Sequence, residues 1–302
     1  MASRPHCKGV SRVRKSRFVD IFRTTPPKTV CPNFYVLAHA NGCSFAPQCD
    51  YCYLKSSFWF LEGYEAFANV DKMFDEVRAW IRLDDLESYV LNSGNLSDSL
   101  AFEKERPIMA RLVEVFREEA EARGRRHALL LVTKGGQVEC KALFAAKPCA
   151  NVIVSFSVNN PEAARACERG AAAVADRLEA ARRLKAAGWR VRIRFDPIMA
   201  GYDYSGVVAE VRRLAPERIT LGSLRAEPSL LRKVNHGMFA GLERPSEARA
   251  LARYPRDERV RMYREVIDGL RGVCPVALCE EPEDVWRELG LDVESKACNC
   301  GS

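Results

Sequence analysis

Three cysteines lie within ten residues of one another in the segment NGCSFAPQCDYCYLKSS, as Cys43, Cys49 and Cys52. Three thiolates cannot complete a tetrahedral structural zinc site, and His39, which is near in sequence, does not stand at a zinc-finger spacing from them. Three thiolates can instead hold three irons of a cubane cluster and leave its fourth iron open to a small molecule. The spacing therefore predicts an open iron–sulfur site in this loop.

The elements that must position this loop follow the pattern of parallel βαβ units, in which short apolar runs alternate with amphipathic stretches. The expected strands lie near residues 34–38, 88–92, 128–133, 152–158, 190–195 and 218–222. The expected helices cover residues 70–83, 108–123, 172–187, 257–271 and 282–289. We therefore expect an α/β fold, a partial (β/α)6 TIM-like barrel with short N- and C-terminal extensions. The cysteine loop follows the first strand, so it should lie at the carboxyl end of the barrel, where active groups gather.

Side chains along the expected strands alternate between the helix layer, which must be apolar, and the interior of the barrel. In NVIVSFSVNN this alternation places Ser155, Ser157 and Asn159 toward the interior, and in RVRIRFDP it places Arg192 and Arg194 there. Guanidinium groups inside a barrel bind an anionic substrate or pair with carboxylates of neighbouring strands. The sequence leaves both options open.

The cysteine loop after the first strand of a six-unit barrel, with Tyr51 just before the last cysteine, resembles the radical SAM superfamily. In that superfamily the open iron of a 4Fe-4S cluster chelates S-adenosylmethionine (SAM), and reductive cleavage gives a 5'-deoxyadenosyl radical. The usual C-x3-C-x2-C spacing is widened here to C-x5-C-x2-C, with Pro47 in the wider gap. The resemblance implies that all three cysteines of the loop are cluster ligands.

Within that superfamily the sequence is most similar to the spore photoproduct lyase group, whose members repair a thymine dimer lesion in DNA. The resemblance covers roughly residues 31–225 and rests on the segments CDYCYLK, SGNLSDS, LLVTKGG and SFSVNNP. It implies that Tyr51 and Tyr53 help to relay a hydrogen atom. It also implies a SAM-binding set made of Ser97 and Asp98 for the amino group, Lys134 for the carboxylate, and Ser157 and Asn159 for a further contact.

One position departs from the pattern of this group. The lyase's hydrogen-donating cysteine stands three residues before the aspartate of the Ser-Asp pair, and that position is Asn95 in this sequence. An amide cannot donate a hydrogen atom as a thiol does. Either another thiol serves as the donor, or the reaction is not thymine dimer repair.

The remaining cysteines divide into isolated residues and a C-terminal group. We expect the isolated ones to be packing residues or incidental free thiols, namely Cys7, Cys31, Cys140, Cys149, Cys167 and Cys274. The chain ends in ESKACNCGS, and the spacing of Cys298 and Cys300 suits a shared metal or a redox pair. If the tail folds over the barrel mouth, either thiol could replace the missing donor, or both could bind a second metal with Cys279. A disordered, reduced tail is the alternative.

The overall composition of the chain indicates which broad class of protein it belongs to. The 302 residues, 47% of them hydrophobic, can bury a large core, and no apolar run approaches the ~18 residues of a membrane span, so no membrane partner is expected. Twelve cysteines without a secretion signal argue for a reducing, cytoplasmic location. A basic N-terminal stretch, with Arg4, Lys8, Arg12 and Arg14 among its residues, is either an arm that binds nucleic acid or a solvated tail.

We therefore expect a cytoplasmic, lyase-like radical SAM enzyme with a 4Fe-4S cluster and SAM as cofactors, and a flavodoxin or ferredoxin as electron donor. Its segments are a basic extension over residues 1–30, a barrel core over residues 31–225 and a helical C-terminal extension over residues 226–302. The substrate is a DNA lesion or, alternatively, a small anionic metabolite or peptide. The predicted catalytic residues are Tyr51, Tyr53, Cys298 and Cys300, and the predicted substrate-binding residues are Arg192, Arg194 and Arg225. The hypothesis from another class is a nucleic-acid-binding module with a structural metal.

Overall fold

A single curved sheet organises the protein. The computed structural model describes residues 12–23, 25–61, 63–234, 237–247, 250–295 and 298–301. The strands, in their order across the sheet, are β1 (Val19–Phe22), β2 (Phe34–Leu37), β5 (Val90–Asn92), β6 (Ala128–Thr133), β7 (Val152–Val158), β8 (Arg190–Ile198), β9 (Arg218–Ser223) and β12 (Val276–Leu278). All neighbours from β2 to β12 pair in parallel, and β1 runs antiparallel to β2.

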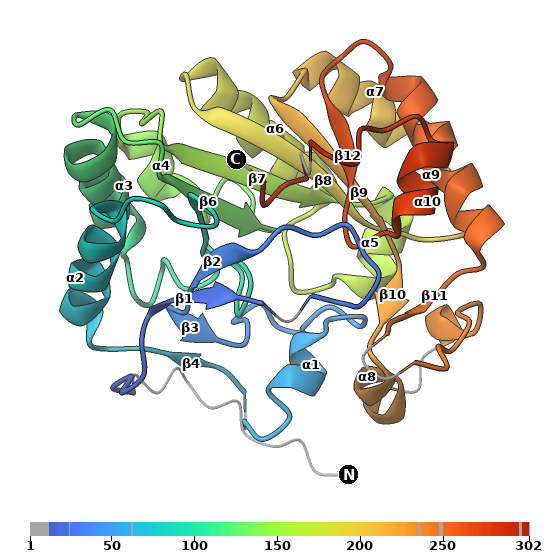
Figure 1. Ribbon diagram of the computed structural model, residues 1–302, viewed down its shortest axis with the longest axis horizontal. Coiled ribbons are helices and arrows are strands. Elements are labelled where there is room, and N and C mark those ends of the chain that lie inside the picture. Colours follow the sequence, from blue (N-terminus) through green and yellow to red (C-terminus); the bar gives the residue numbers. More distant parts are fainter. Residues whose placement is uncertain are drawn as a thin grey trace.

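The predicted α/β class with a parallel sheet is confirmed, and the six expected strands are β2 and β5 to β9. Two strands come from segments that we assigned to the extensions. Both β1 and β12 are short and stand at the two edges of the sheet, and they do not pair with each other within the described ranges. The segment between β1 and β2 crosses toward the β12 side, where Val30 N donates to Glu281 O at 2.8 Å (Figure 1).

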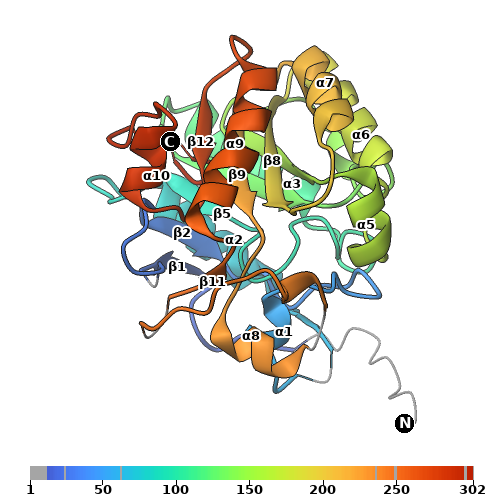
Figure 2. The ribbon, with the colours of Figure 1, turned by 90° about the vertical axis from the view of Figure 1, so that its right-hand side faces the viewer.

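The helices form an arc outside the sheet (Figures 1 and 2). They are α1 (Leu54–Ser57), α2 (Val70–Ile81), α3 (Met109–Phe116), α4 (Lys141–Ala145), α5 (Pro161–Cys167), α6 (Val174–Ala186), α7 (Ser205–Leu214), α8 (Pro228–Lys233), α9 (Arg256–Leu270) and α10 (Glu283–Glu288). A π-helical turn (Arg117–Glu121) continues α3, and a 3-10 turn covers Gly237–Phe239. The five expected helices are α2, α3, α6, α9 and α10, and α6 ends before Gly188, whose φ of +96° suits a glycine C-cap.

Four short strands form two further ladders at the carboxyl end of the main sheet. They are β3 (Ala40–Asn41) paired with β4 (Glu65–Ala66), and β10 (Arg225–Ala226) paired with β11 (Ala252–Arg253). Within the main sheet the predicted alternation holds, because Val154 and Ile193 pack into the large apolar core shared with the helices. On the opposite face, Leu130 and Ile153 belong to a small apolar cluster inside the barrel.

The described part of the N-terminal segment packs on the body of the protein. Arg12 pairs with Glu65 at 2.9 Å, the Arg14 guanidinium lies 5.1 Å from the Phe67 ring centroid, and Phe18 is fully buried. Residues 12, 13 and 15–17 are nevertheless exposed, so this stretch is solvated as well as anchored through Arg14 and Phe18. The rest of the predicted basic arm, with Cys7, lies outside the described residues.

The C-terminal tail, residues 298–301, lies inside the barrel. Arg218 Nη1 donates to Cys298 O at 2.9 Å, and Ser155 Oγ donates to Asn299 Oδ1 at 2.8 Å. Cys300 packs against the inner apolar cluster, whose members stand at the amino ends and middles of their strands. The tail is thus neither disordered nor folded over the barrel mouth, and both of those expectations for it are wrong.

Two further observations concern the chain as a whole. No helix in the described ranges is both long enough and apolar enough to span a bilayer. All described cysteines are free thiols.

Candidate active site

The cysteine loop, residues 42–53, lies at the carboxyl ends of the parallel strands, which we call the mouth of the barrel. It follows β2 and the short β3 and leads into α1. Gly42 N donates to Leu96 O at 2.9 Å, in the loop that follows β5. Asp50 N donates to Cys167 O at 2.8 Å, at the end of α5. The cysteine loop is therefore fixed to the loop after β5 and to the helix that follows β7.

The three thiols of this loop lie within electrostatic range of one another and of two predicted SAM ligands. Burial raises the pKa of Cys43 well above its usual value, and the negative charges of Asp98, Cys52 and Cys49 add to this shift. Burial also raises the pKa of Cys49 to about 12, against the lowering effect of the Lys134 ammonium. No three His, Cys, Asp or Glu side chains of the described residues surround a single ion position. A cubane does not need such a position, because each thiolate binds its own iron.

The widened gap of the cluster motif packs against a glycine. A Cβ on Gly170 would lie 2.6 Å from the carbonyl carbon of Ala46 and would contact the carbonyl oxygen of Pro47 more closely still. Real Cβ atoms do not approach backbone that closely, so only glycine fits here. The C-x5-C spacing is accommodated because the chain after α5 leaves this space.

Asp98 joins the loop after β5 to the loop after β6. Its Oδ1 accepts from Leu100 N at 2.9 Å and from Thr133 Oγ1 at 2.8 Å, and its Oδ2 accepts from Lys134 N at 2.7 Å. Burial raises the pKa of Asp98, and these hydrogen bonds oppose the rise. A carboxylate has about four acceptor positions, so Asp98 keeps capacity for one more donor. Ser97 precedes it and is buried.

Glu168 is the buried centre of the site. It accepts hydrogen bonds from the Tyr51 hydroxyl and from Asn159 Nδ2, the latter at 3.1 Å. It also pairs with Arg177 Nη2 at 2.6 Å and with Lys134 Nζ at 3.5 Å. Burial alone would raise the pKa of Glu168, but the charges of Lys134 and Arg177 and the two hydrogen bonds outweigh burial and lower it to about 2. The carboxylate is thus ionised and holds three predicted site residues together.

Ser157 and Asn159, the predicted Ser-x-Asn pair, stand at the end of β7 beside this centre. Ser157 O accepts from Arg177 Nη1 at 3.0 Å. Asn159 Oδ1 accepts from Tyr204 Oη and Asn160 N, at 2.7 and 2.8 Å, and the Asn159 side chain is fully buried. Both residues lie where the sequence placed them, and their direct contact with SAM stays a prediction.

A comparison with family models decides the family of the chain. The model described as spore photoproduct lyase matches residues 12–219, which is more than half of the chain. The chain belongs to the spore photoproduct lyase family. It is therefore a radical SAM lyase by membership, and the resemblance read from its motifs is confirmed.

Solved structures of spore photoproduct lyase share the fold. A mutant lyase with bound AdoMet and dinucleoside spore photoproduct matches with a TM-score of 0.70 at 18% identity, over 88% of this chain and 80% of the lyase chain. A lyase complexed with dinucleoside spore photoproduct matches with a TM-score of 0.69 at 18% identity, over 87% of this chain and 80% of that one. At this identity the likeness shows a common fold. A comparison with curated proteins found no match.

The two tyrosines predicted to form a relay occupy different surroundings. Tyr51 is held by Glu168, as described above. Tyr53 donates its hydroxyl hydrogen to the backbone carbonyl of Asn95, the position at which the resemblance implies a cysteine. Tyr53 is 42% exposed at the mouth. Tyr53 therefore contacts residue 95 directly, and the relay role of both tyrosines stays a prediction.

The predicted substrate-binding arginines are engaged by the protein itself. Arg192 is buried and donates to Asn299 O at 2.7 Å, so it serves the C-terminal tail, and this placement does not support its predicted role toward substrate. Arg194 and Arg225 both pair with Asp196, and Arg225 also pairs with Glu280 at 2.6 Å. The carboxylate-pairing alternative thus describes this structure, and substrate contact by Arg194 or Arg225 stays a prediction.

Three residues at the site escaped the sequence analysis. Glu168 and Gly170 lie between α5 and α6, and Arg177 lies in the first turn of α6, all within CERGAAAVADR. Each acts through a contact with a distant segment, which no periodicity reveals. A lone acid beside a glycine after a helix is more often solvent-exposed than buried.

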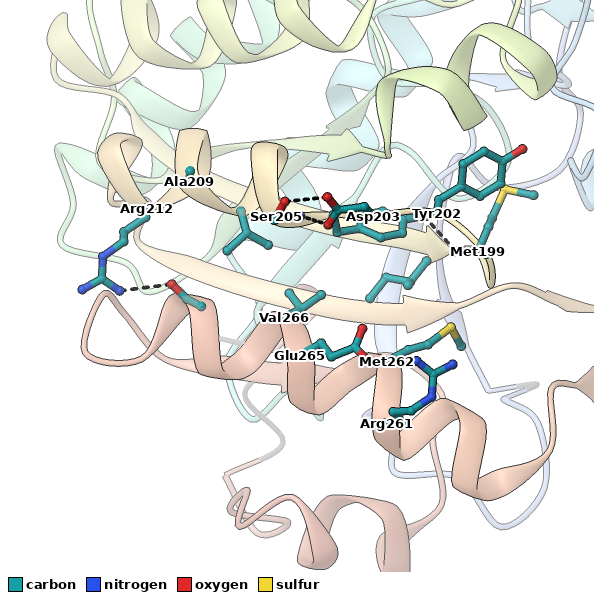
Figure 3. Close-up of a pocket in the computed structure, with 15 residues that line it drawn as sticks. Met199, Tyr202, Asp203, Ser205, Ala209, Arg212, Arg261, Met262, Glu265 and Val266 are labelled. Atoms are coloured by element: carbon teal, nitrogen blue, oxygen red, sulfur yellow. Dashed lines mark hydrogen bonds and ion pairs between the residues drawn. The ribbon is translucent and has the colours of Figure 1, made fainter.

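A cavity in the described part of the chain lies away from this site. It has a volume of about 760 Å³ and lies between α7 and α9 on the outer face of the sheet, where Arg212 donates to Gly269 O at 3.1 Å (Figure 3). None of the residues predicted for the site lines it. We assign it no part in the chemistry at the mouth.

The buried charge of Glu168 leads to a stability prediction. Glu168→Gln should lower the free energy of unfolding at neutral pH by about 3 kcal/mol, because it leaves the buried Arg177 guanidinium without its counter-charge. Since the folded-state pKa is about 2 against an ordinary 4.5, the stabilisation is fully present above 4.5 and is lost as the pH falls toward 2. Urea unfolding at a series of pH values should show the two proteins converging over that range. The control Glu179→Gln, at a half-exposed pair with Arg182, should change stability by less than about 1 kcal/mol.

The close approach at Gly170 gives a second prediction. Gly170→Ala should displace the 46–47 segment, lower the unfolding free energy by about 1–3 kcal/mol and reduce the iron retained after anaerobic reconstitution. Gly206→Ala is the matched control, because a Cβ there meets no atom within 4 Å. Equal iron content in the two variants would show that the cysteine loop does not depend on this contact.

Proposed function

We propose that the protein reductively cleaves SAM at a 4Fe-4S cluster held by Cys43, Cys49 and Cys52. When bound, the cluster and SAM supply a one-electron cleavage that yields a 5'-deoxyadenosyl radical. The observation that carries this proposal is the convergence of the cysteine loop with Asp98 and Lys134 at one end of a parallel sheet. Family membership supports the same reaction type.

The predicted SAM-binding residues have free capacity of the right kind. Asp98 retains an acceptor position for the amino group of SAM, next to Ser97. Lys134 Nζ makes only long contacts, at 3.3 Å to Asp196 O and 3.5 Å to Glu168, so it can donate to the SAM carboxylate at little cost. Asn159 is held in place by Glu168 and Tyr204, so we assign it and Ser157 to shaping the pocket wall that SAM contacts.

We propose a nucleic-acid lesion as the substrate, ahead of a small anionic metabolite or peptide. The rim of the mouth beside α1 carries Trp59 and Phe60, which are 69% and 62% exposed. Lys233 Nζ of α8 lies 4.5 Å from the Trp59 ring centroid. Exposed aromatic rings beside basic side chains are typical of surfaces on which bases stack and phosphates are neutralised. The related lyase structures contain a dinucleoside lesion, which agrees with this choice.

Electrons must reach the cluster from outside, since no residue of the site is a reductant. We propose a flavodoxin or ferredoxin as the donor and the cytoplasm as the compartment, because free thiols and an oxygen-sensitive cluster need reducing surroundings. The nucleic-acid-binding module with a structural metal is set aside, because the family is one of enzymes.

The cleavage activity is tested directly. Anaerobically reconstituted protein with SAM and dithionite should form 5'-deoxyadenosine and methionine, detected by chromatography and mass spectrometry. Cys52→Ala should abolish this product, whereas Cys149→Ala, which removes a buried thiol of the helix layer, should leave it unchanged. A reconstituted wild-type protein that binds iron and forms no 5'-deoxyadenosine would refute the proposal.

The position of Asn95 gives a prediction about the substrate. Asn95→Cys should raise the yield of repaired thymine from dinucleoside spore photoproduct several-fold, because it places a thiol where Tyr53 already contacts the chain. Asn95→Ser is the matched control, since it has similar size and no S–H bond. If both variants give the same yield, the lesion does not bind against residue 95.

A further inference from the structure

Four cysteines from three segments lie toward the β12 edge of the barrel, apart from the cysteine loop. Cys279 follows β12, and its N–H donates to Leu221 O at 2.7 Å, which keeps it in line with the sheet. Cys31 belongs to the β1–β2 segment, which is tied to the residues after β12 by the hydrogen bond from Val30 described above. Cys298 and Cys300 come from the C-terminal tail. Three segments that are far apart in sequence thus deliver cysteines to one place.

The tail is built into this place by specific contacts. Arg192 Nη1 donates to Asn299 O and Gly301 O, at 2.7 and 3.1 Å. Arg218 Nη1 donates to Cys298 O and Gly301 O, at 2.9 and 3.2 Å. Cys298 and Asn299 are 5% and 1% exposed. Two guanidinium groups are therefore devoted to holding a Cys-x-Cys turn inside a barrel.

The four thiols lie within electrostatic range of one another. Burial is the main reason for the raised pKa of Cys31, and the charges of Cys279, Cys300 and Cys298 raise it further. The pKa of Cys300 is likewise raised by burial and then by Cys298, with a smaller effect from Cys279. The sequence analysis assigned Cys31 as a packing residue or incidental free thiol, and in the structure the β1–β2 segment carries it toward the residues after β12.

The surroundings of these thiols suit anionic sulfur. Cys279 Sγ accepts from Arg225 Nη2 at 3.3 Å and from Arg194 Nη2 at 3.6 Å, and Cys300 Sγ accepts from Asn92 Nδ2 at 3.6 Å. Two further buried donors, Arg194 Nε and Asn299 Nδ2, find no hydrogen-bond partner in the described part of the chain. Buried N–H groups without an acceptor cost free energy. A group with additional acceptor atoms among the thiols would satisfy them.

We infer that Cys31, Cys279, Cys298 and Cys300 bind a second iron–sulfur cluster, fully capped by protein thiolates. Four thiolates suit either a tetrahedral zinc ion or a 4Fe-4S cluster. The unpartnered Arg194 Nε and Asn299 Nδ2 favour the cluster, because its bridging sulfides are hydrogen-bond acceptors and a lone zinc ion brings none. This inference goes beyond the proposed function and does not depend on SAM cleavage.

The test counts iron in variants that lack one set of cysteines. After anaerobic reconstitution, the wild-type protein should hold about eight irons per chain, and a Cys43→Ala, Cys49→Ala, Cys52→Ala variant should keep about four. The latter's reduced cluster should give an electron paramagnetic resonance signal that SAM does not alter, as expected for a cluster without an open iron. A variant with no iron, or with one zinc per chain, would overturn the inference.

A second pair of variants guards against misfolding. Cys298→Ser with Cys300→Ser should lose about half of the iron while the cysteine loop keeps its cluster. The matched control, Cys140→Ala with Cys149→Ala, removes two buried thiols of the helix layer and should keep all of the iron. Unchanged iron in the tail variant would overturn the inference. A wild-type protein that holds eight irons and does not cleave SAM would instead count against the proposed function alone.

Discussion

The ionised carboxylate of Glu168 is the interaction on which the candidate site depends. It is fully enclosed and yet charged, because Arg177 and Lys134 lie against it and Tyr51 and Asn159 donate to it. A buried charge is tolerated only when such partners surround it. The same contacts join the cysteine loop, the end of β6 and the end of β7. One buried group therefore sets the relative positions of side chains that are distant in sequence, such as Tyr51, which stands 117 residues before Glu168.

The architecture explains why these loops meet at all. Parallel strands end at one edge of the sheet, so every loop that follows a strand contributes to one mouth. Apolar and polar residues alternate along β7 and β8. The apolar ones, such as Val154 and Ile193, pack into the helix layer, so the polar ones face the interior of the barrel. Different kinds of side chain therefore lie at different depths in the interior of the barrel. Polar groups stand at the mouth, an apolar cluster lies deeper, and the C-terminal tail occupies the remaining space.

Structural features that depend on short-range sequence patterns could be predicted from the sequence. The six central strands and the amphipathic helices follow from periodicity, whereas Asp98 and Lys134 were identified from the resemblance to the family's segments. The strands β1 and β12 were not predicted, since three or four residues at a sheet edge carry too little pattern. Glu168 and Gly170 were missed for a different reason, because their contacts are with distant segments. The arginines of β8 were placed correctly, but their partners are the tail and Asp196.

The two departures from the family pattern affect different parts of the candidate site. The widened cluster loop is absorbed by the space at Gly170, outside the set of residues proposed to hold SAM, so that set need not change with it. Asn95 lies instead against the exposed Tyr53, on the side open to a substrate. The two departures therefore lie in different loops, one packed against Gly170 and the other against Tyr53. Family membership constrains the reaction type more tightly than the substrate, because Asn95 changes the predicted donor position and leaves the proposed cluster ligands in place.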